Sequence, residues 1–223
     1  MKAFKVDLDE RENQIMLKSI ARSFNNQAHQ VNEAAEKIHE LIKNAPYSND
    51  NIVLKRNEIK EAFFSPFKPQ LKNAQVFLSH SHADINKALE VKNYLENQIK
   101  RKVFVDSLFW DYKDDVLNKL AKYDDISKIE DAFTLILRES LEYMIKKCPY
   151  FVFLQSKNSV SNQGLSRITY SAWIYEELKI AHSISESRPI PMMESMQVFH
   201  DISPFLKSFE TITLKKLSQQ INS

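Results

Sequence analysis

Histidine and aspartate alternate with small residues in the segment His80-Ser81-His82-Ala83-Asp84. Imidazole and carboxylate groups at this spacing can ligate a metal ion, and histidine also transfers protons near neutral pH. A second group runs from Asp106 to Trp110, where an acid precedes an indole that can stack on a heteroaromatic base. These residues predict a polar site, and its chemistry depends on the elements that carry them.

Short apolar segments alternate with amphipathic ones from residue 74 onward. We predict strands at 74–79, 102–106 and 150–154, helices at 84–98, 133–148 and 171–184, and a tail with strands near 190 and 211–214 and a final helix. Such alternation with apolar strands is typical of an α/β fold, a parallel sheet covered by helices. Ligands bind at the carboxyl ends of these strands. The residues that follow the strands therefore belong to one candidate site.

The N-terminal third has a different pattern. Residues 1–72 are predicted to form a helical region that precedes an α/β domain at 73–223. Apolar residues recur at steps of three or four over 9–44 and predict one long helix. A stripe this narrow packs either on its own domain or on a second copy of the chain. Residues 51–72 predict a shorter helix followed by a proline-containing connector.

Composition excludes two common nucleotide sites. The chain of 223 residues has one glycine, whereas average usage of about 7% corresponds to roughly fifteen. A G-x-G-x-x-G loop requires three glycines and a Walker A loop requires two, because backbone must approach phosphate closely. Lysine plus arginine (31) nearly balance aspartate plus glutamate (29), which argues against a nucleic-acid binder.

Several features predict a cytoplasmic protein. The single cysteine, Cys148, excludes an intrachain disulfide and fits a reducing compartment. The N-terminal sequence Met-Lys-Ala-Phe-Lys-Val-Asp-Leu-Asp-Glu is interrupted by charge too early for the apolar segment of a signal peptide. No apolar run reaches the ~18 residues that span a bilayer. We therefore expect no membrane and no nucleic acid among its partners.

Four segments occur in a characteristic order. They are Val-Phe-Leu-Ser-His-Ser-His-Ala-Asp (76–84), Val-Phe-Val-Asp (103–106), Tyr-Phe-Val-Phe-Leu-Gln-Ser-Lys-Asn-Ser (150–159) and Ser-Ala-Trp-Ile-Tyr-Glu-Glu-Leu (171–178). Together they resemble the first three strands and the S-x-W-x-x-x-E-L helix of Toll/interleukin-1 receptor (TIR) domains of the bacterial type. The resemblance covers about half of the chain and implies a flavodoxin-like fold.

The resemblance also implies an activity. Catalytic TIR domains cleave the bond between nicotinamide and ribose in NAD⁺ and release ADP-ribose, cyclised or base-exchanged products, in bacteria commonly for antiphage signalling. It implies Glu177, four residues after Trp173, as the catalytic residue, with Glu176 as the neighbouring alternative. NAD⁺ is then the substrate, and no further cofactor is implied.

One carboxylate suffices for this chemistry. Nicotinamide leaves as a neutral molecule, so no general acid is required, and positive charge develops on the ribose as in glycoside hydrolysis. A carboxylate beside the ribose stabilises that charge. On the predicted helix, Glu177 borders the apolar stripe of Ile174, Leu178 and Ala181, and Trp173 shares its face. The alternative is an ordinary solvated glutamate.

The remaining candidate residues are predicted to contact NAD⁺: Ser79, His80, Ser81, Asp106, Trp110 and Trp173. The alternative role for most of them is capping and loop packing. Asp84, which follows the same strand as Ser79, is as consistent with a helix N-cap as with a site residue. The chain departs from the family after Asp106, where the loop expected to cover the site lacks its usual glycine and residues 111–132 read as an insertion.

Other functions remain open. H-x-H-x-D begins the metal-binding motif of metallo-β-lactamase-like hydrolases, although Ile85 stands where that motif continues with histidine. A TIR domain can also be a non-catalytic adaptor, which needs no glutamate at position 177. Cys148 falls on the inward side of a helix, where a thiol is unreactive. Both TIR functions are compatible with a homo-oligomer formed through the TIR domain and the N-terminal helices, and with a sensor or effector partner.

Overall fold

The computed structural model describes residues 1–18, 31–48, 51–52, 54–64, 73–163, 166–186 and 200–222. The chain divides into two compact units. The first comprises Met1–Ser23, Asn73–Ser107 and Glu142–Ser223, and the second comprises Phe24–Lys72 and Leu108–Leu141. This division differs from the predicted boundary at residue 72, because the N-terminal residues join the first unit and the segment after Ser107 joins the second.

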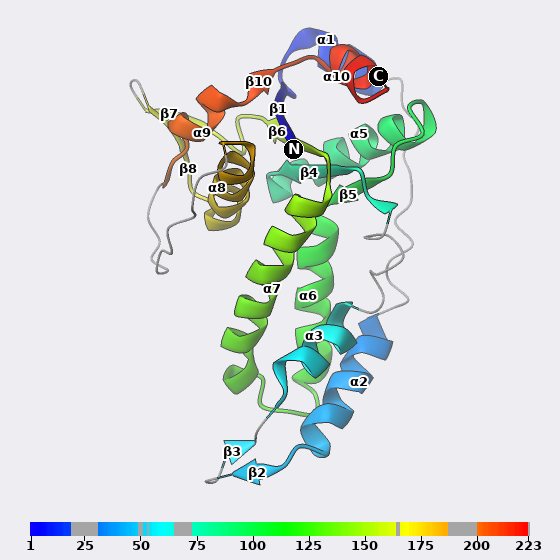
Figure 1. The fold of residues 1–223 in the computed structure, drawn as a ribbon, viewed down its shortest axis with the longest axis vertical. Coiled ribbons are helices and arrows are strands. Elements are labelled where there is room, and N and C mark those ends of the chain that lie inside the picture. Colours follow the sequence, from blue (N-terminus) through cyan, green and yellow to red (C-terminus); the bar gives the residue numbers. More distant parts are fainter. Residues whose placement is uncertain are drawn as a thin grey trace. The chain divides into compact units, whose positions relative to one another are not determined.

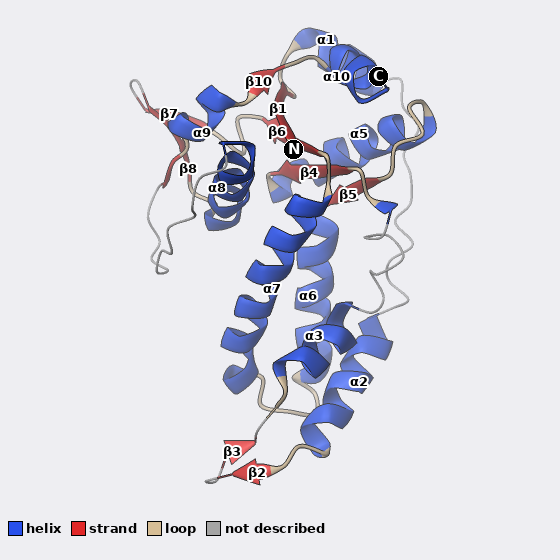
Figure 2. Ribbon diagram, in the orientation of Figure 1, coloured by secondary structure: helices blue, strands red, loops and turns tan. Residues whose placement is uncertain are grey.

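The first unit is built on a five-stranded parallel sheet flanked by helices, so the predicted α/β, flavodoxin-like fold class is confirmed (Figures 1 and 2). Its strands are β1 (Lys2–Asp7), β4 (Val76–His80), β5 (Val103–Val105), β6 (Tyr150–Gln155) and β10 (Glu210–Thr211). Their order across the sheet is β10-β1-β6-β4-β5. Counted from β4 along the chain, β5, β4 and β6 take the first three places of the flavodoxin order 2-1-3-4-5. The N-terminal strand β1 takes the fourth.

Strand β1 corrects the prediction that residues 1–72 are helical. Phe4 and Val6 alternate with polar residues and are buried, the pattern of a strand with one face in the core. All six residues of β1 pair with β6, from Lys2 opposite Tyr150 to Asp7 opposite Gln155. These residues form a strand because they pair with β6, which is far away in the sequence, and a local helical pattern could not show this.

Helices flank this sheet as its amphipathic segments predict. Helix α5 (Ile85–Asn97) contacts β4 and β5, and its apolar residues Ala88, Val91 and Leu95 are buried. Helix α8 (Ala172–Glu186) contacts β1 and β4. Helix α1 (Arg11–Lys18) contacts α5 and α10 (Leu214–Asn222), which is the predicted final helix.

A small antiparallel sheet lies outside the predicted elements. It consists of β7 (Ser161–Gln163), β8 (Ser166–Thr169) and β9 (His200–Asp201), and is followed by the short helix α9 (Ser203–Ser208). The strand predicted near residue 190 lies outside the described residues. The strand predicted at 211–214 is shorter than expected, because β10 ends at Thr211 and α10 begins at Leu214.

The second unit is mainly helical. It contains α2 (Val31–Lys43), α3 (Arg56–Phe64), most of α6 (Ser107–Leu120) and of α7 (Ser127–Lys147), and a hairpin of β2 (Tyr47–Ser48) and β3 (Asn51–Ile52). The rings of Phe63 and Phe133 meet edge to face at 5.3 Å, and His39 Nδ1 lies 2.8 Å from Asp124 Oδ2. The second contact joins the segment read as an insertion, 111–132, to the N-terminal region, and the first does the same for the residue that follows it.

The helix predicted over 9–44 is described in two parts, α1 in the first unit and α2 in the second, with 19–30 outside the described residues.

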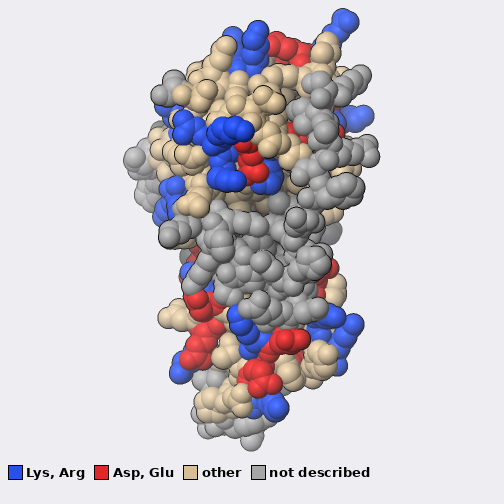
Figure 3. All heavy atoms as spheres, turned by 90° about the vertical axis from the view of Figure 1, so that its right-hand side faces the viewer, with Lys and Arg blue, Asp and Glu red and all other residues tan. Residues whose placement is uncertain are grey.

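None of the described helices is long and apolar enough to cross a membrane. On the face in Figure 3, lysine and arginine side chains are interspersed with aspartate and glutamate.

Candidate functional site

The candidate site lies at the carboxyl ends of β4, β5 and β6. After β4 the chain passes through α5 to the edge strand β5, whereas after β6 it passes to β7, β8 and α8. Adjacent strands whose connections diverge form a topological switch point, where open α/β sheets bind ligands. Ser79, His80 and Asp106 are at or just beyond these strand ends.

Glu177 is directly linked to β4. Its side chain is fully buried on α8, and the Ser79 hydroxyl donates a hydrogen bond to Glu177 Oε2 over 2.5 Å. Ser79 is fully buried as well. A hydrogen bond to a carboxylate is shorter and stronger than one between neutral groups. The structure therefore joins the predicted catalytic residue to a predicted NAD⁺ contact, and it contradicts the alternative of a solvated Glu177.

The sheet face beneath this pair is aromatic. Ser79 lies opposite Phe153 of β6, and Phe77, two residues earlier and hence on the same face, lies opposite Phe151. The Phe77 ring stacks on Phe151 and tilts against Phe104, both at 5.7 Å between centroids. A carboxylate in such surroundings is shielded from water, which strengthens its attraction for a nearby cation.

The adjacent glutamate has a different environment. Glu176 forms an ion pair with Lys179 at 3.5 Å, and the Lys179 ammonium lies 5.6 Å from the centre of the Tyr175 ring. Burial, together with the Glu176 charge, raises the pKa of Tyr175. Trp173 is half-buried one turn before Glu177. Glu176 is therefore already neutralised by a lysine of its own helix.

His80 and Asp106 form a second buried pair. His80 Nδ1 lies 2.6 Å from Asp106 Oδ1, and the same oxygen accepts a hydrogen bond from the Ser107 backbone N–H over 2.7 Å. The side chains are 0% and 5% exposed. Asp106 thus holds both the end of β4 and the start of α6, which is the capping and packing role weighed as the alternative to NAD⁺ contact.

Two further predicted contacts, Trp110 and Ser81, follow the ends of β5 and β4. Helix α6 begins at Ser107, directly after Asp106, so the expected covering loop is replaced by helix. Trp110 is in that helix and its side chain lies outside the described residues. Ser81 is half-buried before the short 3₁₀ turn His82–Asp84, and its carbonyl accepts the Asp84 N–H.

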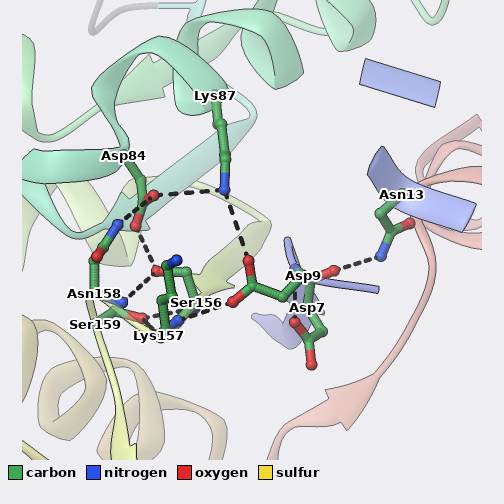
Figure 4. Close-up of polar contacts among 9 residues, drawn as sticks. All are labelled: Asp7, Asp9, Asn13, Asp84, Lys87, Ser156, Lys157, Asn158 and Ser159. Atoms are coloured by element: carbon green, nitrogen blue, oxygen red, sulfur yellow. Dashed lines mark hydrogen bonds and ion pairs between the residues drawn. The ribbon is translucent and has the colours of Figure 1, made fainter. Parts of the chain in front are cut away.

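Asp84 connects the segment after β4 with the turn after β6 (Figure 4). It makes no N-cap hydrogen bond to α5. Instead its buried carboxylate accepts hydrogen bonds from Ser156 Oγ at 2.5 Å and Asn158 Nδ2 at 2.9 Å, in the turn after β6. Lys87 Nζ lies 3.8 Å from Asp84 and 3.7 Å from Asp9, which follows β1. The sequence signals for this cluster were Asp84 itself and the serines of the segment 150–159, which follow a predicted strand.

We expect the Asp84→Ala substitution to lower the free energy of unfolding by about 2–3 kcal/mol, because it leaves two donors without their buried acceptor. Lys87 is 38% exposed and its contacts with Asp9 and Asp84 are long, at 3.7 and 3.8 Å, so Lys87→Ala is expected to change stability by less than about 1 kcal/mol. Urea denaturation of both variants measures the difference. Equal losses would show that Asp84 does not clamp these loops.

Residues of the alternative chemistries are dispersed. Of the H-x-H-x-D motif, His80 faces Asp106, His82 is exposed, and Asp84 binds Ser156 and Asn158. No group of three His, Cys, Asp or Glu side chains in the described ranges could hold a metal ion. Cys148 is buried, and burial raises its pKa to about 12, which keeps the thiol protonated and unreactive.

These features define an α/β protein with a buried carboxylate at the carboxyl edge of its parallel sheet. No protein-family model, curated protein or solved structure matches the chain. The function is therefore argued from the site and from the resemblance of its four segments.

Proposed function

We propose that this protein is a TIR-type enzyme that cleaves the nicotinamide–ribose bond of NAD⁺, with Glu177 as its catalytic residue. The observation that carries the proposal is the hydrogen bond from Ser79 to Glu177, which joins residues 98 positions apart. It holds an acid in a defined orientation at the edge where α/β sheets bind ligands. The S-x-W-x-x-x-E-L segment supports the same residue independently of its burial.

The reaction requires charge stabilisation more than proton transfer. The C1′–N bond breaks, its electron pair leaves with nicotinamide, and the ribose becomes oxocarbenium-like. The Glu177 carboxylate stabilises this cation in surroundings of low polarity. Water, a group of the same ADP-ribose or another base then attacks C1′, giving hydrolysis, cyclisation or base exchange.

In this proposal the enzyme acts in the bacterial cytoplasm in antiphage signalling. Catalytic TIR domains commonly work as assemblies in which a neighbour helps to complete the site, so activity would depend on self-assembly or on a sensor or effector partner. A steep dependence of specific activity on protein concentration would support control by self-assembly.

The test is nicotinamide release from NAD⁺ by the full chain, followed by chromatography with mass detection over a range of protein concentrations. We expect release, and the accompanying product identifies the reaction. A wild-type chain that remains inactive, both alone and with lysate of phage-infected cells, would contradict the proposal and favour an adaptor.

A further inference from the structure

A groove of about 1120 Å³ lies within the second unit. It is formed by α2, α3 and the segments between them. Its apolar lining residues are Leu41, Ala45, Pro46, Leu54 and Ala62. Aliphatic parts of the surrounding charged side chains add to this surface. The groove therefore offers an apolar floor to an external occupant.

The rim of the groove is mainly acidic. Glu36 and Glu40 are one turn apart on α2, and Glu58 and Glu61 are one turn apart on α3. All four are exposed. Among the described lining residues, these four carboxylates are accompanied by two lysines, Lys37 and Lys55. The rim is therefore net acidic, although the whole chain carries +2.

Lysines pair with two of these four glutamates, but the pairs are weak. Lys55 Nζ lies 3.0 Å from Glu58 Oε1, and Lys43, outside the lining, lies 4.0 Å from Glu40 Oε1. Lys43 and Lys55 are each more than half exposed, so both ion pairs are weak. An occupant that brings its own cations can replace these pairs while covering the floor.

We propose that this groove binds a basic amphipathic helix of a partner protein. Such a helix places apolar residues at i, i+3, i+4 and i+7 on the floor, in the helix-in-groove mode, and its flanking lysines or arginines meet the two acidic rows. The lining residues of α2 and its end run from Glu36 to Asn44, a span of about 12 Å, so two to three turns of the occupant lie along the groove. The groove shares no residue with the Glu177 site, and the inference does not depend on the proposed reaction.

The test uses two fluorescent peptides of about 14 residues. Both carry leucine at the four apolar positions, and the flanking positions are lysine in one and glutamate in the other. Fluorescence anisotropy with the full chain is expected to give at least about 10-fold tighter binding of the lysine peptide, and the preference should fall with added salt. Glu40→Lys is expected to weaken that binding about 10-fold.

Glu12→Lys is the matched control, because Glu12 is an exposed helix glutamate of the first unit and its reversal changes the net charge equally. It should leave binding unchanged. Equal affinity for both peptides, no binding of either, or the same loss in both variants would overturn the proposal. A wild-type dimer that Glu40→Lys dissociates would also overturn it, since the occupant would then be a second copy.

Discussion

Replacing Glu177 by glutamine is expected to reduce nicotinamide release from NAD⁺ about 1,000-fold, the size of effect seen when one preorganised charge-stabilising group is removed. Glutamine has nearly the same shape and can still accept the hydrogen bond that Ser79 donates at 2.5 Å. The substitution therefore removes the negative charge while leaving the packing in place. Initial rates measured by chromatography at several NAD⁺ concentrations should show the loss mainly in kcat.

Glu176→Gln is the matched control for this measurement. Glu176 is the adjacent residue of α8 and pairs with Lys179, so its substitution removes the same charge without touching the Ser79 contact. We expect activity within about threefold of wild type, because glutamine keeps an oxygen that can accept a hydrogen bond from the buried Lys179. Loss of activity in Glu176→Gln together with full activity in Glu177→Gln would make Glu176 the catalytic residue in place of Glu177.

Ser79→Ala is expected to lower kcat about 30- to 100-fold with little change in KM. The hydroxyl donates to Glu177, so its removal lets the carboxylate turn away from the reacting ribose, and misplacement of a catalytic group reduces kcat. If Ser79 instead contacted NAD⁺ directly, KM would rise. Steady-state kinetics with the folded variant separate the two roles.

Ser183→Ala is a suitable control for the Ser79 variant. Ser183 is a buried serine of the same helix, α8, and its hydroxyl donates to the Ile180 carbonyl within that helix. Both kinetic constants should match wild type. A decrease in kcat as large as that of Ser79→Ala would show that general loosening of α8, and not the orientation of Glu177, controls the rate.

Local sequence patterns predicted the strands and helices whose own residues show a clear apolar periodicity. The apolar run 150–154, which lies in β6, and the helix α5 are examples. Strand β1 was missed because its partner, β6, is distant in the chain, although the alternation of Phe4 and Val6 was a signal for a strand. The grouping of α6 and α7 with α2 and α3 depends on contacts such as Phe63 with Phe133, which no local pattern reveals.

The site was predictable to a similar degree. The order of segments brought Ser79 and Glu177 to one edge, but it could not indicate that they bond to each other. For Asp84 the sequence left a helix cap open as one role, since its position before α5 fits that role. Its actual partners, Ser156 and Asn158, follow another strand and become neighbours only when β4 and β6 pair. Which polar groups become hydrogen-bond partners therefore depends on the tertiary structure.

The position of β1 also has a consequence for the order of folding. The first residues of the chain occupy an interior place in the sheet, between β6 and β10. During synthesis Lys2–Asp7 must wait until Tyr150–Gln155 and then Glu210–Thr211 have left the ribosome. Closing so long a loop is entropically unfavourable, and contacts of this kind slow folding. Until β1 inserts, β6 has an open edge that can pair with other chains, so nascent molecules depend on rapid pairing of β6 with their own β1.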